Sequence, residues 1–156
     1  MSSTRKTKPR RVDGDFLKIP LADDLHSCAR VLPHAVYAFY DIATEKELAL
    51  KEIARCPVLF VVAVMDYAIK SGRWVSIGNL PLEKHLQANY TFFIQDPLDP
   101  ESFQIYFQSG EVKPATRREC ARLERASVWD PEHVESRILD HRNKIPNKWV
   151  QAQAIK

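Results

Sequence analysis

Apolar residues in the first forty positions follow the two-residue period of short β-strands. Leu17, Ile19 and Leu21 recur at every second position, and a polar turn sequence separates them from a second apolar segment at residues 26–32. Residues 36–42 carry apolar side chains in both phases of the alternation. The pattern predicts a hairpin and a third strand that is apolar on both faces. Three short strands in succession are typical of a curled sheet or partial barrel.

A helix is expected next. Thr44 and Glu47 have the spacing of a capping box, in which each side chain satisfies a free amide at the start of a helix. Leu48 and Ile53 would form its inward face. Pro57 ends the helix, because proline disfavours helical geometry in the residue before it.

The longest apolar run of the chain covers eight residues, 58–65, and is rich in valine. Such a run is typical of a central strand that is buried on both faces. Ser71 and Gly72 then predict a hairpin turn that leads into a strand at residues 74–77. Beyond it the pattern predicts one short helix and two strands, at residues 81–86, 90–95 and 103–108.

Helix signals gather near the C-terminus. Thr116 and Glu119 form a second capping box, with Cys120, Leu123 and Ser127 as the expected inward stripe. Asp130 followed by proline predicts a further helix to about residue 141. Strands therefore precede helices, without a β-α-β alternation. We expect one α+β domain at residues 12–156, with a curled antiparallel N-terminal sheet of SH3-like partial-barrel character and helices packed at the C-terminal end.

Charge divides the chain into two parts. Five cations and no acid lie in the first eleven residues, which we expect to form a flexible basic arm: Arg5, Lys6, Lys8, Arg10 and Arg11. Because the whole chain has a formal charge of +3, the other 145 residues carry −2. The arm could grip phosphates as a nucleic-acid clamp or serve only as a solubilising tail. The acidic body argues against recognition of a nucleic-acid sequence.

Composition argues against several protein classes. An apolar run of eight residues is far shorter than the ~20 that a bilayer-spanning helix needs, and no apolar stretch follows the basic N-terminus as in a signal peptide. We therefore expect a cytoplasmic protein without a membrane partner. Three widely spaced cysteines, Cys28, Cys56 and Cys120, are expected to stay reduced. Four glycines are too few for a phosphate loop or dinucleotide fingerprint, so no cofactor is expected. The chain has no C-x-x-C pair and no H-E-x-x-H motif, so no metal is expected either.

Candidate chemistry is sparse. His133, Arg137 and His141 share one face of the last predicted helix, but histidines eight residues apart lie about 12 Å apart along the axis, too far to ligate one ion. A solvated charged face is the favoured interpretation, and no catalytic residue is expected. Arg30 and Asp66 are charges within or beside apolar strand patterns. A charge at such a position needs a partner, which is either an internal ion pair or capping contact, or a group of a bound protein.

Several segments carry a more specific signature: Gly14-Asp15-Phe16, Ile19-Pro20-Leu21, Ala29-Arg30-Val31-Leu32, residues 57–69, Gly72-Arg73-Trp74, Phe93-Ile94-Gln95-Asp96-Pro97, Pro114-Ala115-Thr116 and Trp129-Asp130-Pro131-Glu132-His133-Val134-Glu135. Together they resemble the immunity protein 26 family, predicted antidotes encoded beside bacterial polymorphic toxins, over about residues 14–156. The triplet His26-Ser27-Cys28 departs from the glycine or aromatic residue expected before the Ala-Arg pair. The resemblance implies one cytoplasmic domain that binds a cognate protein toxin, such as a nuclease, without catalysis.

We expect the toxin contact at two segments that combine charged and aromatic side chains. The first contains Asp66, Arg73 and Trp74, and the second contains Trp129, Asp130, Glu132 and His133. For each tryptophan, ordinary core packing is the competing interpretation. Two other functions stay open. One is a nucleic-acid-binding module that uses the basic arm, and the other is a small hydrolase that uses His133 or His141.

Overall fold

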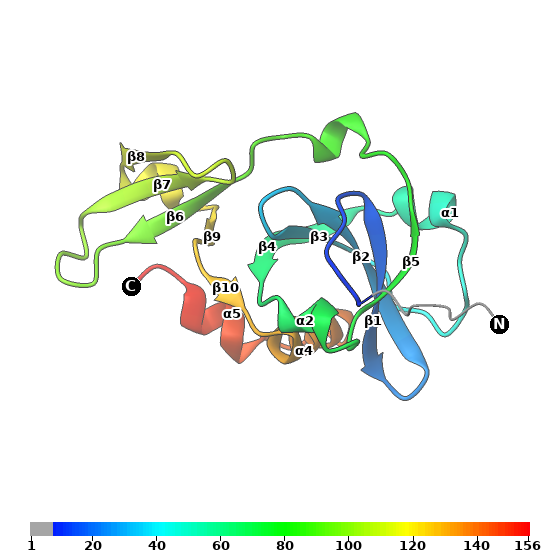
Figure 1. Cartoon of the computed structure of the whole chain (residues 1–156). Coiled ribbons are helices and arrows are strands. Elements are labelled where there is room, and N and C mark those ends of the chain that lie inside the picture. The colour runs from blue at the N-terminus through cyan, green and yellow to red at the C-terminus, as the bar shows by residue number, and fades with distance from the viewer. Residues whose placement is uncertain (1–7) are drawn as a thin grey trace.

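Residues 8–156 are described by the computed structural model, which contains two β-sheets and several short helices (Figure 1). The larger sheet has the order β10-β4-β3-β2-β1-β5 and consists of β1 (Asp15–Ala22), β2 (Leu25–Leu32), β3 (Val36–Tyr40), β4 (Val58–Val64), β5 (Val75–Asn79) and β10 (Val128–Trp129). The smaller sheet has the order β8-β7-β6-β9 and consists of β6 (Thr91–Gln95), β7 (Phe103–Phe107), β8 (Val112–Ala115) and β9 (Glu124–Arg125).

The helices are short except for one. They are α1 (Leu50–Ala54), α2 (Tyr67–Lys70), α3 (Arg117–Cys120), α4 (Pro131–Arg142) and α5 (Lys148–Gln153), with a 3-10 turn η1 (Lys84–Leu86). Figure 1 shows α2, α4 and α5 gathered along one side of the larger sheet. The fold is therefore α+β, as the sequence predicts, and neither sheet closes into a barrel.

The strands with clear apolar patterns form where they are expected. β1 and β2 make an antiparallel hairpin that pairs Leu17 with Ala29, and its turn places Asp23 in the left-handed region at φ 51°. Every residue of β3 is buried. β4 is a central strand between β3 and β10, although only one of its two faces is fully buried. The positions of these strands confirm the predictions based on short-range periodicity, whereas the predicted full burial of both faces of β4 is not observed.

The predicted hairpin at Ser71 and Gly72 is wrong. The short helix α2 lies there instead, and the following strand β5 pairs with β1 at the opposite edge of the sheet, with Ser76 beside Leu17. The physical reason is that β4 already has a partner on each side, β3 and β10, so the next strand cannot pair with it. β10 lies far along the chain, and nothing near Gly72 in the sequence reveals its presence.

The first capping box is also wrong. Thr44 forms an isolated bridge with His26, and the helix begins six residues later at Leu50, where Glu52 accepts a hydrogen bond from the amide of Ala49 at 3.4 Å. The backbone of Thr44 is thus already paired with β2. The second box is confirmed, since Thr116 accepts from the amide of Glu119 at 3.2 Å. Its helix stops at Cys120, because the chain then turns to form β9 on the smaller sheet.

Two of the four apolar clusters of the interior lie on opposite faces of the larger sheet. The first lies between the larger sheet and α4, whose residues Val134 and Ile138 are buried there. The second lies between the two sheets and joins Val36 and Ala38 of β3 to Phe92 of β6. The larger sheet therefore buries apolar residues against α4 on one face and against the smaller sheet on the other.

Candidate functional site

The parallel pairing of β4 with β10 brings together two segments that are far apart in sequence. Val128 pairs with Ala63 and Trp129 with Val64, so the two strands run in the same direction and end at the same edge. The chain continues from β4 into α2 and from β10 into α4, and both helices start side by side (Figure 1). The amide of Met65 donates to the carbonyl of Trp129 at 2.9 Å and closes this junction.

Most of the contact residues predicted from the sequence meet at this junction. We define the α2–α4 surface as the side chains of Asp66, Tyr67, Arg73, Asp130, Glu132 and His133. Hydrogen bonds and ion pairs join its two halves, which are roughly sixty residues apart in sequence. Of the predicted set, only Trp74 and Trp129 lie behind this surface, since both are buried.

A buried carboxylate supports the surface from below. Glu135 of α4 accepts two hydrogen bonds from Arg73, from Nε and Nη2, each at 2.7 Å. It also accepts one from the indole Nε1 of Trp74 at 2.9 Å. The hydrogen bond to Glu135 is the main cause that raises the pKa of Arg73. A bidentate pair of this kind fixes both position and orientation, so Arg73 is held in place.

The two tryptophans act as supports and offer little contact area. Trp74 is 1% exposed and packs edge-on against Phe39 at a centroid distance of 5.6 Å. Trp129 is buried beside Arg137, whose guanidinium lies 3.7 Å from the ring centroid of Phe60. Both tryptophans therefore pack in the core, which is the competing interpretation given above.

Tyr67 links the two helices at the exposed side of the surface. Its hydroxyl donates to Glu132 at 2.7 Å and lies 3.4 Å from the carboxylate of Asp130. The hydrogen bond to Glu132 is the largest cause that raises the pKa of Tyr67 to about 12, and the same bond lowers the pKa of Glu132. Next to it, His133 lies 3.5 Å from Asp130 and stacks on Trp149 at 3.5 Å.

Three carboxylates of the surface remain open to solvent. The side chains of Asp66, Asp130 and Glu132 are 58%, 45% and 47% exposed. The cations near them make loose contacts, with Arg11 at 3.4 Å and Lys70 at 3.6 Å from Asp66. Exposed pairs of this geometry contribute little stability and exchange readily with water or with a partner. The surface therefore presents acidic groups around a rigid arginine and a tyrosine.

Tyr67 and Glu135 were not predicted from the sequence. Glu135 does carry a signal, because it stands four residues after Pro131 and one after Val134, on the inward side of the helix pattern. A charge at such a position needs a partner. Tyr67 has no comparable signal, since its role depends on the approach of α4.

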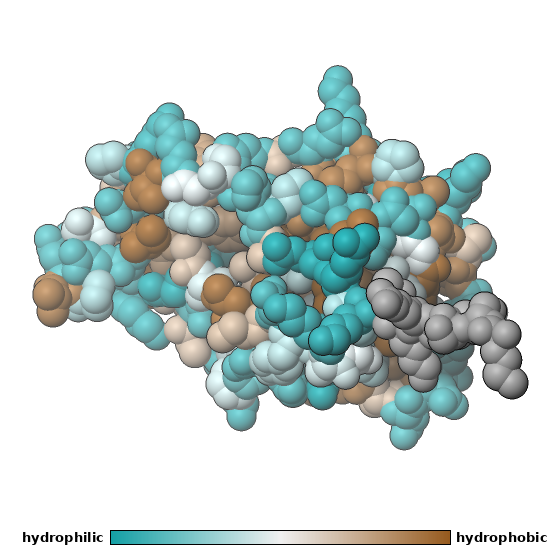
Figure 2. Space-filling model, in the orientation of Figure 1, coloured by the Kyte–Doolittle hydropathy of each residue, from teal (hydrophilic) through white to brown (hydrophobic). Residues whose placement is uncertain are grey.

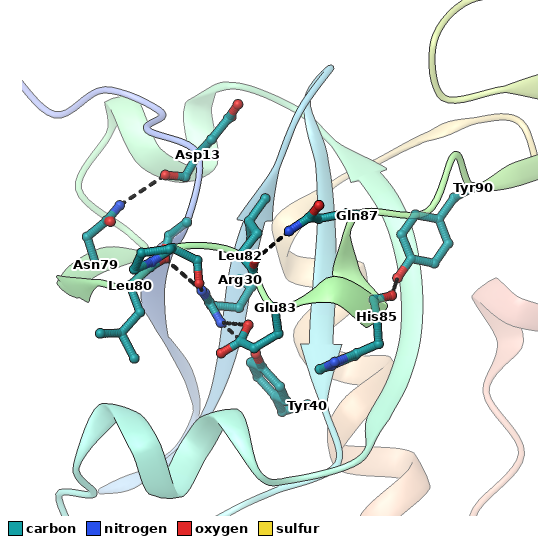
Figure 3. Close-up of polar contacts among 12 residues, drawn as sticks. Asp13, Arg30, Tyr40, Asn79, Leu80, Leu82, Glu83, His85, Gln87 and Tyr90 are labelled. Atoms are coloured by element: carbon teal, nitrogen blue, oxygen red, sulfur yellow. Dashed lines mark hydrogen bonds and ion pairs between the residues drawn. The ribbon is translucent and has the colours of Figure 1, made fainter.

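Arg30 forms a second polar centre, shown in Figure 3. It is 0% exposed, and its guanidinium donates to the carbonyls of Gly14 at 3.0 Å and Leu80 at 2.8 Å and to Glu83 at 2.8 Å. It also lies 4.0 Å from the ring centroid of Phe16. These contacts correspond to the ion-pair alternative. They fasten residues 80–83, the segment that connects β5 to η1, onto the larger sheet.

The remaining candidate residues of α4 form ion pairs with other parts of the protein. Arg137 makes a bidentate pair with Glu124, and His141 lies 3.5 Å from Asp41. Within residues 8–156, no three His, Cys, Asp or Glu side chains are placed to hold a metal ion. The three cysteines, all described, are free thiols. Of the basic arm, Arg5 and Lys6 lie outside the described residues, Lys8 and Arg10 are exposed, and Arg11 contacts Asp66.

Comparison with known proteins gives one match. A family model described as Immunity protein 26 matches residues 12–104, from the residues before β1 into β7. This range contains Asp66, Arg73 and Trp74 but ends before α4. No curated protein and no solved structure matches the chain. In the part that the structure describes, no helix is long and apolar enough to cross a membrane.

Proposed function

The chain belongs to the immunity protein 26 family, and we propose that it binds a cognate bacterial toxin in the cytoplasm and blocks it through the α2–α4 surface. The protein acts as a binding inhibitor and not as an enzyme. Its partner carries basic side chains that meet Asp66, Asp130 and Glu132, with Arg73 and Tyr67 as the central contacts.

The observation that carries this proposal is the junction itself. One half of the α2–α4 surface comes from the family-matched range and the other from α4, and the tight Arg73–Glu135 pair holds them together. Arginine and tyrosine are residue types that dominate binding energy at interfaces. Three half-exposed carboxylates around them supply the polar rim of such a site.

The charge of the surface indicates the kind of toxin. A nuclease attracts the polyanionic backbone of its substrate with basic side chains. An acidic surface accelerates encounter with such a protein, because complementary charge raises the association rate more than it raises the final affinity. The proposal therefore favours a nuclease toxin.

Co-expression with the toxin encoded beside the gene tests the proposal. Glu132→Lys should abolish or strongly reduce protection of the host cell and binding of the purified toxin. Glu47→Lys makes the same charge change at an exposed position before α1 and should protect like the wild type. Full protection by the Glu132 variant would refute the proposed surface, whereas a wild-type protein that neither binds nor protects would refute the function.

A further inference from the structure

An apolar pocket opens between the two sheets, next to the α2–α4 surface. Its volume is about 480 Å³. One wall comes from the larger sheet, with Val36, Ala63 and Val128, and the other from the smaller sheet, with Phe92, Ile94 and Tyr106. The second apolar cluster fills the rest of the space between the sheets. The pocket is therefore the open end of that interface.

The size and lining of the pocket fit the insertion of a side chain. Binding pockets are concave, mostly apolar and typically about 300–1,000 Å³ in volume. Val128 lies at the opening and is 55% exposed. Figure 2 shows hydrophobic spheres in the middle of the molecular face, where β10 lies in Figure 1. Small side chains, including Ala63 and Ala126, leave the space unfilled.

The opening is held by fixed contacts. Gln108 donates to the carbonyl of Pro33 at 2.8 Å and accepts from the amide of Tyr90 at 3.2 Å, which ties the turn between β2 and β3 to the smaller sheet. His34 and Ala35 in that turn have φ angles of 64° and 61°. Residues other than glycine rarely adopt this conformation, and here it forms the tight turn between β2 and β3. The rim thus keeps its shape before any partner arrives.

The surroundings of the pocket determine its occupant. Asp66 stands three residues after Ala63, and Asp130 stands two residues after Val128. At about 3.3 Å per residue, Asp130 and Asp66 stand roughly 7 Å and 10 Å along the backbone from the residues that line the pocket. Met65, which is 43% exposed, stands between Ala63 and Asp66 in the chain. A partner held by its basic side chains on this surface therefore places its neighbouring residues over the pocket.

We infer that this pocket receives one aromatic or large aliphatic side chain from a basic segment of the partner protein. The inference rests on the proposed function, because it assigns the partner's basic side chains to the α2–α4 surface. An apolar side chain inserted in a pocket and surrounded by a charged rim has the arrangement of an interface hot spot. The pocket supplies affinity, and the carboxylates supply orientation and encounter rate.

Peptide titration of the full-length, ¹⁵N-labelled protein tests the inference. The probes are the pentapeptides Lys-Lys-Phe-Lys-Lys, Lys-Lys-Ala-Lys-Lys and Glu-Glu-Phe-Glu-Glu. The first should shift the amide signals of Ala35, Ala63 and Val128. Loss of the phenyl ring should weaken binding about tenfold to one-hundredfold, and reversal of the peptide charge should weaken it as well.

Three variants test whether the peptide binds at the pocket. Val128→Lys places a cation at the pocket opening, and Val75→Lys makes the same change at an equally exposed valine on the opposite edge of the same sheet. Only the first should reduce binding of the basic phenylalanine peptide by tenfold or more. Ala63→Leu, which fills the pocket from inside, should do so without changing charge. Equal affinity for the phenylalanine and alanine peptides, or equal effects of the two lysine variants, would overturn the inference.

Toxin neutralisation separates this inference from the proposed function. If Val128→Lys and Ala63→Leu still neutralise the toxin and bind it with unchanged affinity, while Glu132→Lys does not, the pocket assignment is wrong and the proposed function stands. If the basic phenylalanine peptide binds at the pocket but the wild-type protein binds no toxin, the pocket stands and the immunity function is wrong.

Discussion

The indole nitrogen of Trp74 donates a hydrogen bond of 2.9 Å to Glu135, a residue 61 positions away on a different element. The same carboxylate holds Arg73 by two further hydrogen bonds. A core tryptophan and a surface arginine therefore share one acceptor, and the position of the exposed guanidinium depends on the interior of the protein.

Replacement of Glu135 by alanine should destabilise the fold by about 2–4 kcal/mol, because it leaves the Trp74 N–H and the Arg73 guanidinium without their acceptor. Urea denaturation measures the change. Glu132→Ala, three residues earlier in α4 and on the exposed side, should cost less than about 1 kcal/mol. Equal costs for the two variants would contradict the supporting role of Glu135.

Replacement of Arg30 by methionine should cost about 3 kcal/mol, because the carbonyls of Gly14 and Leu80 lose a charged donor in a buried site. Amide hydrogen exchange should rise in residues 80–83, which this arginine fastens to the sheet. Glu83→Gln retains an acceptor at a half-exposed position and should be milder. Unchanged exchange in residues 80–83 would show that other contacts hold this segment.

The ionisation of Tyr67 should depend on Glu132. A pKa of about 12 lies above the ordinary value of 10.0, so the folded state holds the phenolic proton more tightly than the unfolded state. The stability from this contact is complete below pH 10 and is lost as the pH rises towards 12. For Glu132 the pKa is lowered, so its contribution is present above pH 4.5 and lost in acid.

Carbon-13 NMR of the tyrosine Cζ atoms measures this coupling. In Glu132→Gln the pKa of Tyr67 should fall towards 10.0, because the largest cause of its shift is removed. The pKa of Tyr90, raised by burial alone, serves as an internal control and should not change. A Tyr67 pKa that stays near 12 in this variant would mean that Glu132 is not the cause.

Replacement of Arg11 by glutamine should accelerate association with a basic toxin several-fold at low salt, because it uncovers the carboxylate of Asp66. Folding stability should change by less than about 0.5 kcal/mol, since the pair is exposed. Arg10→Gln changes the same charge at a residue outside this ion pair. Stopped-flow association measures both variants. If both instead weaken binding to nucleic acid in a salt-dependent way, the clamp alternative is favoured.

Local sequence patterns predicted the elements whose signals are complete within a few residues. The first hairpin needs only alternation and a turn, and α4 begins where Asp130 and Pro131 predict it. The prediction at Ser71 and Gly72 was wrong because strand pairing depends on which edge is free. The capping box at Thr44 was wrong because His26 already pairs with its backbone.

The sequence also predicted only some of the residues of the candidate site. Asp66, Arg73, Asp130, Glu132 and His133 were selected from charge and aromatic content, and the structure brings them to one surface. The buried positions of Trp74 and Trp129 could not be read from residue type, since tryptophan serves equally in cores and at interfaces. Tyr67 was missed because its partners come from another element.

The sequence by itself determined the α+β class, the strands with strong periodicity and the last long helix, because these depend on interactions between near neighbours in the chain. Only the tertiary structure decided that β10 pairs with β4 and that Glu135 lies beneath Arg73 and Trp74. It also decided that an apolar pocket stays open between the sheets. These features arise from contacts between residues about thirty to ninety positions apart, and no local pattern records which distant segments pack together.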